Sequence, residues 1–196
     1  FNIALKGTFD DCQDIIKNLF RDDELNQRLN LGSINSINWT RIMAQITYYI
    51  YAYNKVKKET GSSNISFSIP TGNFGDAYAG YIAKEKFNIP IKKLIVATNK
   101  NNILDRFFRT GTYKKDKVFT TISPSMDIQI ASNFERLLYH ITNESGEKVS
   151  EFMNSFKEKG VIKVEKKHYE KTKESFVSFS VNAVSYTHLR AHETRP

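Results

Sequence analysis

The chain has 196 residues, of which 40% are hydrophobic and 26% charged, a composition that suits a globular protein with a buried core and excludes a disordered or fibrous one. Its longest apolar run, residues 48–53, is far shorter than the roughly 20 residues that a membrane-spanning helix needs, so we expect no membrane partner. The net charge is +8, but acidic residues interrupt the basic clusters and arginine does not alternate with aromatic residues, which favours a solvated surface over a nucleic-acid partner.

The first part of the chain is predicted to hold two helices and a strand. Apolar residues recur at helical spacing over residues 9–20, where the hydroxyl of Thr8 can cap the helix. A longer helix is expected to begin near Ser36 and to run toward the lysines around Lys55. Residues 64–69 alternate and are rich in β-forming residues, which predicts a strand that ends at Pro70.

The rest of the chain continues this alternation. Helices are expected over residues 76–87, 103–109, 133–141 and 147–159, and strands over residues 93–98, 118–122, 161–164 and 176–181. Because neighbouring parallel strands need long crossovers, which helices supply, this order predicts an α/β fold with a largely parallel sheet.

The single cysteine and the C-terminal residues set two further expectations. Cys12 alone excludes an internal disulfide and a multi-cysteine metal site, and it fits a reducing compartment such as the cytoplasm. Residues 185–196 change character abruptly and contain two of the four histidines. We therefore expect a native α/β region over residues 1–184 and a vector-derived tail over 185–196.

A turn with two glycines joins the strand at 64–69 to the helix at 76–87. Gly72, Asn73, Phe74 and Gly75 can curl tightly and point backbone N–H groups off the helix N-terminus, which is the outline of a phosphate site. Many turns of this kind only connect elements, so the spacing alone leaves both interpretations open.

A second candidate anion site lies at the start of the long helix. Asn35 and Ser36 can cap this helix, while Asn38 and Arg41 are three residues apart and share a face. The planar guanidinium of Arg41 suits a phosphate group. By spacing alone, an ordinary helix cap followed by a surface arginine is the simpler alternative.

Five segments carry a family resemblance. In chain order they are GTFDDCQDIIKNLF, NLGSINSINWTRIMAQITYYIYAY, SIPTGNFGDAYAGYIAK, IKKLIVATNKNNILDRFF and SPSMDIQIASNFERLLY. They resemble successive blocks of the pyridoxal-phosphate-dependent threonine synthases over residues 7–139, with a looser continuation toward residue 184. The resemblance implies the fold of the tryptophan synthase β subunit and the conversion of O-phosphohomoserine and water into threonine and phosphate.

The resemblance also implies the roles of the two candidate sites. The Gly-Asn-Phe-Gly turn of the family holds the phosphate of pyridoxal 5'-phosphate, which assigns this role to Gly72, Asn73, Phe74 and Gly75. The segment that faces the substrate phosphate corresponds to Ser36, Asn38 and Arg41, and less directly to Asn35. We expect no metal.

One departure from the family limits what the chain can do. The family's Schiff-base lysine lies upstream of these blocks in a Phe-Lys-Asp context, and the chain contains no such triplet. Lys6, in Leu-Lys-Gly, does not match it, and the C-terminal block of the family would lie beyond residue 184. We therefore expect an internal fragment of a lyase, with no catalytic residue of its own and no activity alone.

Other functions stay open at this point. Another lyase of the same fold, of the serine/threonine dehydratase or cysteine synthase type, is the nearest enzyme alternative, and Arg41 discriminates because a dehydratase has no leaving phosphate to bind. A non-catalytic phosphate-binding module and a basic nucleic-acid binder are alternatives from other classes.

Titratable residues outside these motifs receive smaller roles. His140 and His168 are expected to be surface or capping residues. Glu135 and Arg136 are adjacent on a helix and face apart, so we expect them to meet solvent or another helix.

Overall fold

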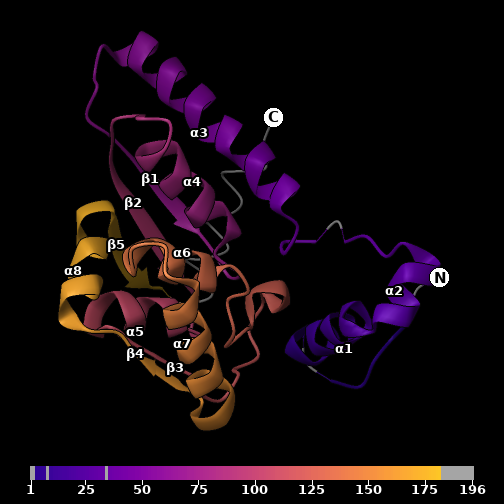
Figure 1. The fold of residues 1–196 in the computed structure, drawn as a ribbon. Helices are drawn as coiled ribbons and strands as arrows, with labels where there is room; N and C mark the ends of the chain where they lie inside the picture. Colours follow the sequence, from indigo (N-terminus) through magenta and orange to yellow (C-terminus); the bar gives the residue numbers. More distant parts are fainter. Residues whose placement is uncertain (1–2, 8, 34, 182–196) are drawn as a thin grey trace.

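The computed structural model describes residues 3–7, 9–33 and 35–181, in which helices pack around a small parallel sheet (Figure 1). The helices are α1 (Phe9–Arg21), α2 (Asp23–Leu29), α3 (Trp39–Thr60), α4 (Gly75–Glu85), α5 (Ile103–Thr110), α6 (Phe134–Ile141), α7 (Gly146–Lys159) and α8 (Lys166–Ser175), with a 3-10 turn, η1 (Pro124–Met126). The strands are β1 (Ile65–Pro70), β2 (Ile91–Thr98), β3 (Thr112–Lys114), β4 (Val161–Lys163) and β5 (Phe176–Ser180). This order confirms the predicted α/β class.

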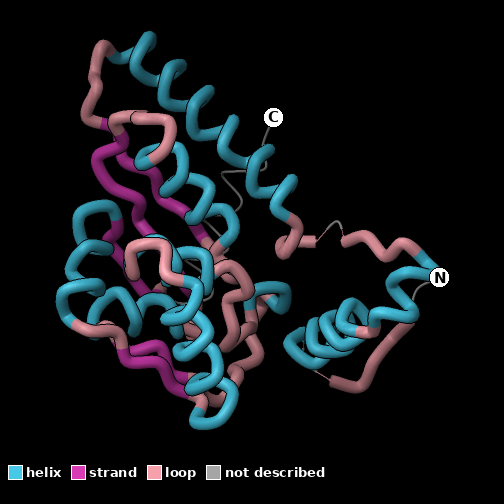
Figure 2. Tube along the Cα trace, in the orientation of Figure 1, coloured by secondary structure: helices cyan, strands magenta, loops and turns pink. Residues whose placement is uncertain are grey.

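The main sheet has the order β1-β2-β5, and both pairings are parallel. Helix α4 makes the crossover from β1 to β2, and α5 to α8 lie on the long path from β2 to β5 (Figure 2). Strands β3 and β4 form a separate antiparallel pair. The carboxyl ends of β1 and β2 meet at one edge of the main sheet, which is where parallel sheets place their binding loops.

Helices cover one face of the main sheet within the described residues. Leu94, Val96 and Phe176 are buried on this face, and α4 packs between it and α3. The alternate residues Val177 and Phe179 are 37% and 48% exposed. Since parallel sheets normally bury both faces, the second face is the surface on which further structure would pack.

The predicted strand over 118–122 is wrong. The backbone of Phe119 is held by a side chain, because Asn101 Nδ2 donates to its carbonyl oxygen at 2.8 Å and its N–H donates to Asn101 Oδ1 at 2.8 Å. The backbone N–H of Thr121 donates to Asp127 Oδ2 at 2.7 Å. These bonds replace those that a neighbouring strand would supply.

The long helix also begins later than predicted. Asn38, and not Asn35 or Ser36, is its N-cap, and the helix ends at Thr60 with Gly61 in the left-handed conformation. Thr8 and the proposed tail at 185–196 lie outside the described residues. No helix in the described part of the chain combines the length and hydropathy needed to cross a membrane.

Candidate functional site

The glycine turn lies at the carboxyl edge of the main sheet, directly after β1. The Thr71 N–H donates to the Ala97 carbonyl at 3.0 Å, which ties the turn to β2. The Thr71 hydroxyl accepts from the Phe74 N–H at 3.2 Å and donates to the Asp76 carboxylate. Phe74 is the N-cap of α4 and holds the left-handed conformation, with φ at 67°. The turn therefore has a fixed shape that leads straight into a helix.

Several polar groups of this turn have no partner among the residues that the structure describes. The N–H groups of Phe74 and Ala77 are used internally, whereas those of Gly72, Asn73 and Gly75 have no partner among the described residues. The Asn73 Oδ1 atom is buried and also lacks a partner. Unsatisfied donors at the positive end of a helix dipole form an anion-binding arrangement.

Other residues pack closely against both glycines of the turn. A Cβ atom at Gly72 would lie 2.6 Å from Met126 Sδ, and one at Gly75 would lie 3.1 Å from Asn133 Nδ2 and 3.4 Å from Ile42 Cδ1. The turn is thus packed between α3 on one side and the segment that contains η1 on the other.

The second predicted segment forms the N-terminus of α3. Asn35 Oδ1 accepts from the Ile37 N–H at 2.9 Å, and Asn38 Oδ1 accepts from the Thr40 N–H at 2.8 Å. Asn38 Nδ2 donates to the Ser33 carbonyl. Both amides therefore shape the entry into the helix, and the exposed Arg41 lies in its first turn.

Asn133 joins the two predicted segments. Its Nδ2 atom donates to the Ser36 carbonyl at 2.9 Å and to the Asn73 carbonyl at 3.2 Å, and its backbone N–H donates to the Asn73 carbonyl at 3.1 Å. The side chain is completely buried. The N-termini of α3 and α4 consequently adjoin, so their dipoles favour negative charge in the same region. Sequence reasoning gave Asn133 no role, although it lies in one of the resembling blocks.

A buried polar cluster, formed by Asn99, Asn101, Thr121 and Asp127, holds the segment around η1 in place. Asp127 Oδ1 accepts from Asn99 Nδ2 at 2.9 Å, from Asn101 Nδ2 at 3.0 Å and from Thr121 Oγ1 at 2.7 Å. The carboxylate is thus surrounded by donors at the carboxyl end of β2. By fixing Asp127, the cluster also fixes the adjacent Met126 against Gly72.

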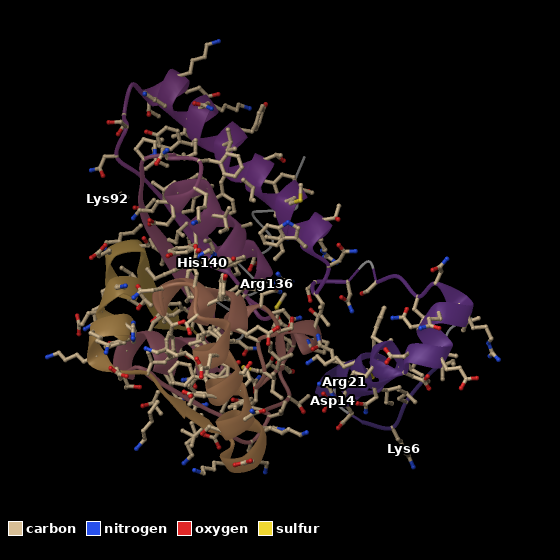
Figure 3. All side chains as sticks on the ribbon, in the orientation of Figure 1. Lys6, Asp14, Arg21, Lys92, Arg136 and His140 are labelled. Carbon is tan, nitrogen blue, oxygen red and sulfur yellow. The ribbon has the colours of Figure 1, made fainter. Side chains whose placement is uncertain are left out.

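The histidines differ from expectation. His140 lies on α6 (Figure 3) beside Tyr78, whose hydroxyl is 2.9 Å from His140 Nε2. Burial raises the pKa of Tyr78 to about 12, and burial together with Lys86 lowers the pKa of His140. His168 is not a surface residue, because it is only 4% exposed and its Nδ1 donates to the Ile141 carbonyl at 2.7 Å. Because histidine is polar, apolar periodicity could not reveal that His168 is buried.

The described residues contain no cluster of three or more His, Cys, Asp or Glu side chains with the geometry to hold a metal ion. The donors near the glycine turn are backbone and carboxamide N–H groups. This donor set suits an anionic group and not a cation.

The chain was compared with known proteins. No protein-family model matches it. It is 45% identical over 190 residues to the threonine synthase of Saccharomyces cerevisiae, an alignment that covers 92% of this chain and 37% of the relative. The chain therefore spans little more than a third of the length of the curated relative.

Solved structures give the same result. A pyridoxal-phosphate-bound threonine synthase from Brucella melitensis matches with a TM-score of 0.79 and 41% identity, over 91% of this chain and 38% of that one. The yeast threonine synthase matches with a TM-score of 0.80 and 45% identity, over 93% and 37%. These matches confirm the resemblance and the fold type that the sequence predicts.

Proposed function

We propose that the chain, which has the sequence and the fold of part of a threonine synthase, forms the phosphate-binding centre of such an enzyme. The observation that carries the proposal is the contact of Asn133 with both Ser36 and Asn73, because it joins two anion-binding segments into one region. An enzyme that binds a phosphorylated cofactor and a phosphorylated substrate together needs two such segments side by side. The reaction class is that of a lyase that acts on a phosphate ester.

The glycine turn fits the phosphate group of pyridoxal 5'-phosphate. The N–H groups of Gly72, Asn73 and Gly75, which lack a partner among the described residues, would donate to its oxygens, and the buried Oδ1 atom of Asn73 would accept from a donor group of the cofactor. When bound, the cofactor supplies an electron sink for proton removal next to the amino group of the substrate. The turn anchors and orients it.

The N-terminus of α3 fits the phosphate of O-phosphohomoserine. Ser36, Asn38 and Arg41 lie within the last residues before this helix and its first turn, with Asn35 shaping the approach. Arg41 would pair with the dianion, and the helix dipole would add to this attraction. Because the phosphate becomes the leaving group, these residues hold the developing charge as well as the substrate.

The 196 residues alone are proposed to be inactive. The chain contains no Phe-Lys-Asp triplet, so it lacks the lysine that the family resemblance places on the cofactor. We place the parent enzyme in the cytoplasm, which is supported by the single cysteine.

The test uses the longer polypeptide that contains this segment and its flanking sequence. With O-phosphohomoserine as substrate, Arg41→Ala is expected to raise KM at least about tenfold, since a charge-assisted contact to phosphate is lost. Lys58→Ala, at the other end of the same helix, is the matched control and should leave KM unchanged. Phosphate release and threonine formation are measured together.

Two results would contradict the proposal. If the wild-type polypeptide forms no threonine from O-phosphohomoserine, or if Arg41→Ala leaves its kinetics unchanged, a dehydratase or cysteine synthase activity is favoured instead. A strong, salt-dependent affinity of the 196-residue chain for DNA would favour a nucleic-acid binder.

A further inference from the structure

Arg136 on α6 fixes the orientation of the Asn133 carboxamide. Its Nε atom donates to Asn133 Oδ1 at 3.0 Å. A guanidinium can only donate, so the oxygen of the carboxamide must face Arg136 and the NH2 group must face the Ser36 and Asn73 carbonyls. The direction of the bridge between the two segments is thus set by Arg136.

The same guanidinium also holds the second segment directly. Arg136 Nη2 donates to the Ile37 carbonyl at 2.9 Å, and the guanidinium lies over the ring of Trp39 at 5.4 Å. Ile37 and Trp39 flank Asn38, the N-cap of α3. Figure 3 shows Arg136 at the side of α6 that faces α3 and α4. The start of α3 and helix α6, which are far apart in sequence, therefore meet at this side chain.

We propose that Arg136 and Asn133 are positioning residues, which hold the segment of Ser36, Asn38 and Arg41 at a fixed place relative to the glycine turn. This inference rests on the proposed function of the two segments. It assigns Arg136 no contact with substrate or cofactor: the Nε and Nη2 atoms of Arg136 donate to Asn133 and Ile37, which are residues of the protein itself.

The positioning role predicts a specific kinetic signature. Lysine keeps the charge of Arg136 but offers a single nitrogen, which cannot reach both Asn133 Oδ1 and the Ile37 carbonyl in the fork geometry of arginine. In the longer polypeptide, Arg136→Lys is expected to raise KM for O-phosphohomoserine about tenfold and to change kcat less than about threefold. A purely structural role would lower the folded fraction and kcat and would leave KM unchanged.

Arg109→Lys is the matched control. Arg109 also donates through Nε, to Asp105 Oδ1 at 2.9 Å, but it lies at the end of α5 and contacts neither segment. It should leave both KM and kcat unchanged. The affinity for pyridoxal phosphate, titrated by its absorbance, should change less than about threefold in either variant, because the amides of the glycine turn remain.

A double-mutant cycle separates positioning from general stability. If Arg136 acts through the segment that carries Arg41, the effect of Arg136→Lys should depend on Arg41. The factor by which Arg136→Lys raises KM should be at least about threefold smaller in an Arg41→Ala background than in the wild type. Fully additive effects on KM would overturn the inference. So would an unchanged KM in a variant that folds with a normal unfolding temperature.

A second variant tests the inference if Arg136→Lys does not fold. Arg136→Gln keeps one donor group and should reproduce the rise in KM. If neither variant folds, Arg136 is required for folding and the positioning role is overturned. If Arg41→Ala raises KM but Arg136→Lys does not, only this inference fails, whereas no effect of Arg41→Ala contradicts the proposed function itself.

Discussion

The hydroxyl of Tyr78 and Nε2 of His140 share a hydrogen bond of 2.9 Å, which joins α4 to α6. Burial raises the pKa of Tyr78 to about 12, so the hydroxyl stays protonated at neutral pH. The other ring nitrogen of His140, Nδ1, lies 3.5 Å from Glu144 Oε1.

This contact predicts a pH dependence of stability. Burial and the positive charge of Lys86 lower the pKa of His140, so the unfolded chain takes up a proton at a higher pH than the folded chain does. The unfolding free energy should therefore decrease as the pH falls from 7.5 through about 6.5, the pKa of an unfolded histidine. The measurement is the unfolding temperature of the 196-residue chain between pH 5.5 and 7.5.

The matched variant is His140→Gln, which keeps a polar group but cannot titrate. Its unfolding temperature should decrease less than that of the wild type over the same pH range. Parallel pH profiles for the two proteins would show that His140 does not contribute to the dependence.

Asp127→Asn should destabilise the chain. The carboxylate accepts four hydrogen bonds from Asn99, Asn101 and Thr121. In the variant the negative charge is lost, and an amide NH2 group would face groups that can only donate or that donate in the wild type. We expect the unfolding free energy to decrease by about 2–4 kcal/mol, measured by urea denaturation.

Asp116→Asn is the control for this effect. Asp116 Oδ2 lies 3.5 Å from Arg106 Nη1, and the Asp116 side chain is 62% exposed, so its replacement should change the unfolding free energy by less than about 0.5 kcal/mol. Equal effects of the two substitutions would contradict the structural role given to the polar cluster.

Gly75→Ala should weaken cofactor binding. The new Cβ would lie 3.1 Å from Asn133 Nδ2, an atom that two carbonyls hold in place, so either the Asn133 side chain or the glycine turn must move by a few tenths of an ångström. We expect the affinity of the chain for pyridoxal phosphate to fall about tenfold, the equivalent of about 1.4 kcal/mol. Trp39 is the only tryptophan and lies at the start of α3, so quenching of its fluorescence can report the binding.

Gly146→Ala is the matched control, because Gly146 is likewise the first residue of a helix and a Cβ there meets nothing within 4 Å. It should leave the affinity for pyridoxal phosphate unchanged. If both alanine variants bind the cofactor as the wild type does, the glycine turn is not its phosphate site.

Apolar periodicity predicted the elements of the parallel sheet and most of its helices because these bury regular apolar faces. It missed α8, whose buried face consists of His168, Tyr169, Thr172 and Ser175 and therefore has a polar pattern. It also missed α2, which buries no residue. The false strand at 118–122 arose because side-chain hydrogen bonds from Asn101 cannot be read from β-propensity.

The candidate site was predicted in part. The glycine turn and the segment around Arg41 are each continuous in sequence, so turn chemistry and the family resemblance could predict both as candidates. Asn133 and Arg136 act across 97 and 99 residues of sequence, through hydrogen bonds to the backbone of Ser36 and Ile37. Such contacts depend on how the chain folds back on itself, and residue types alone predicted for Arg136 only solvent or another helix.

The most direct test of two adjoining phosphate sites is a crystal structure of the longer polypeptide with pyridoxal phosphate and a phosphonate analogue of O-phosphohomoserine. We predict that the cofactor phosphate lies on the N–H groups of Gly72–Gly75 and that the phosphonate lies at Ser36, Asn38 and Arg41, with Asn133 between the two segments. A phosphonate bound away from Arg41, or a cofactor phosphate bound away from the glycine turn, would contradict this account.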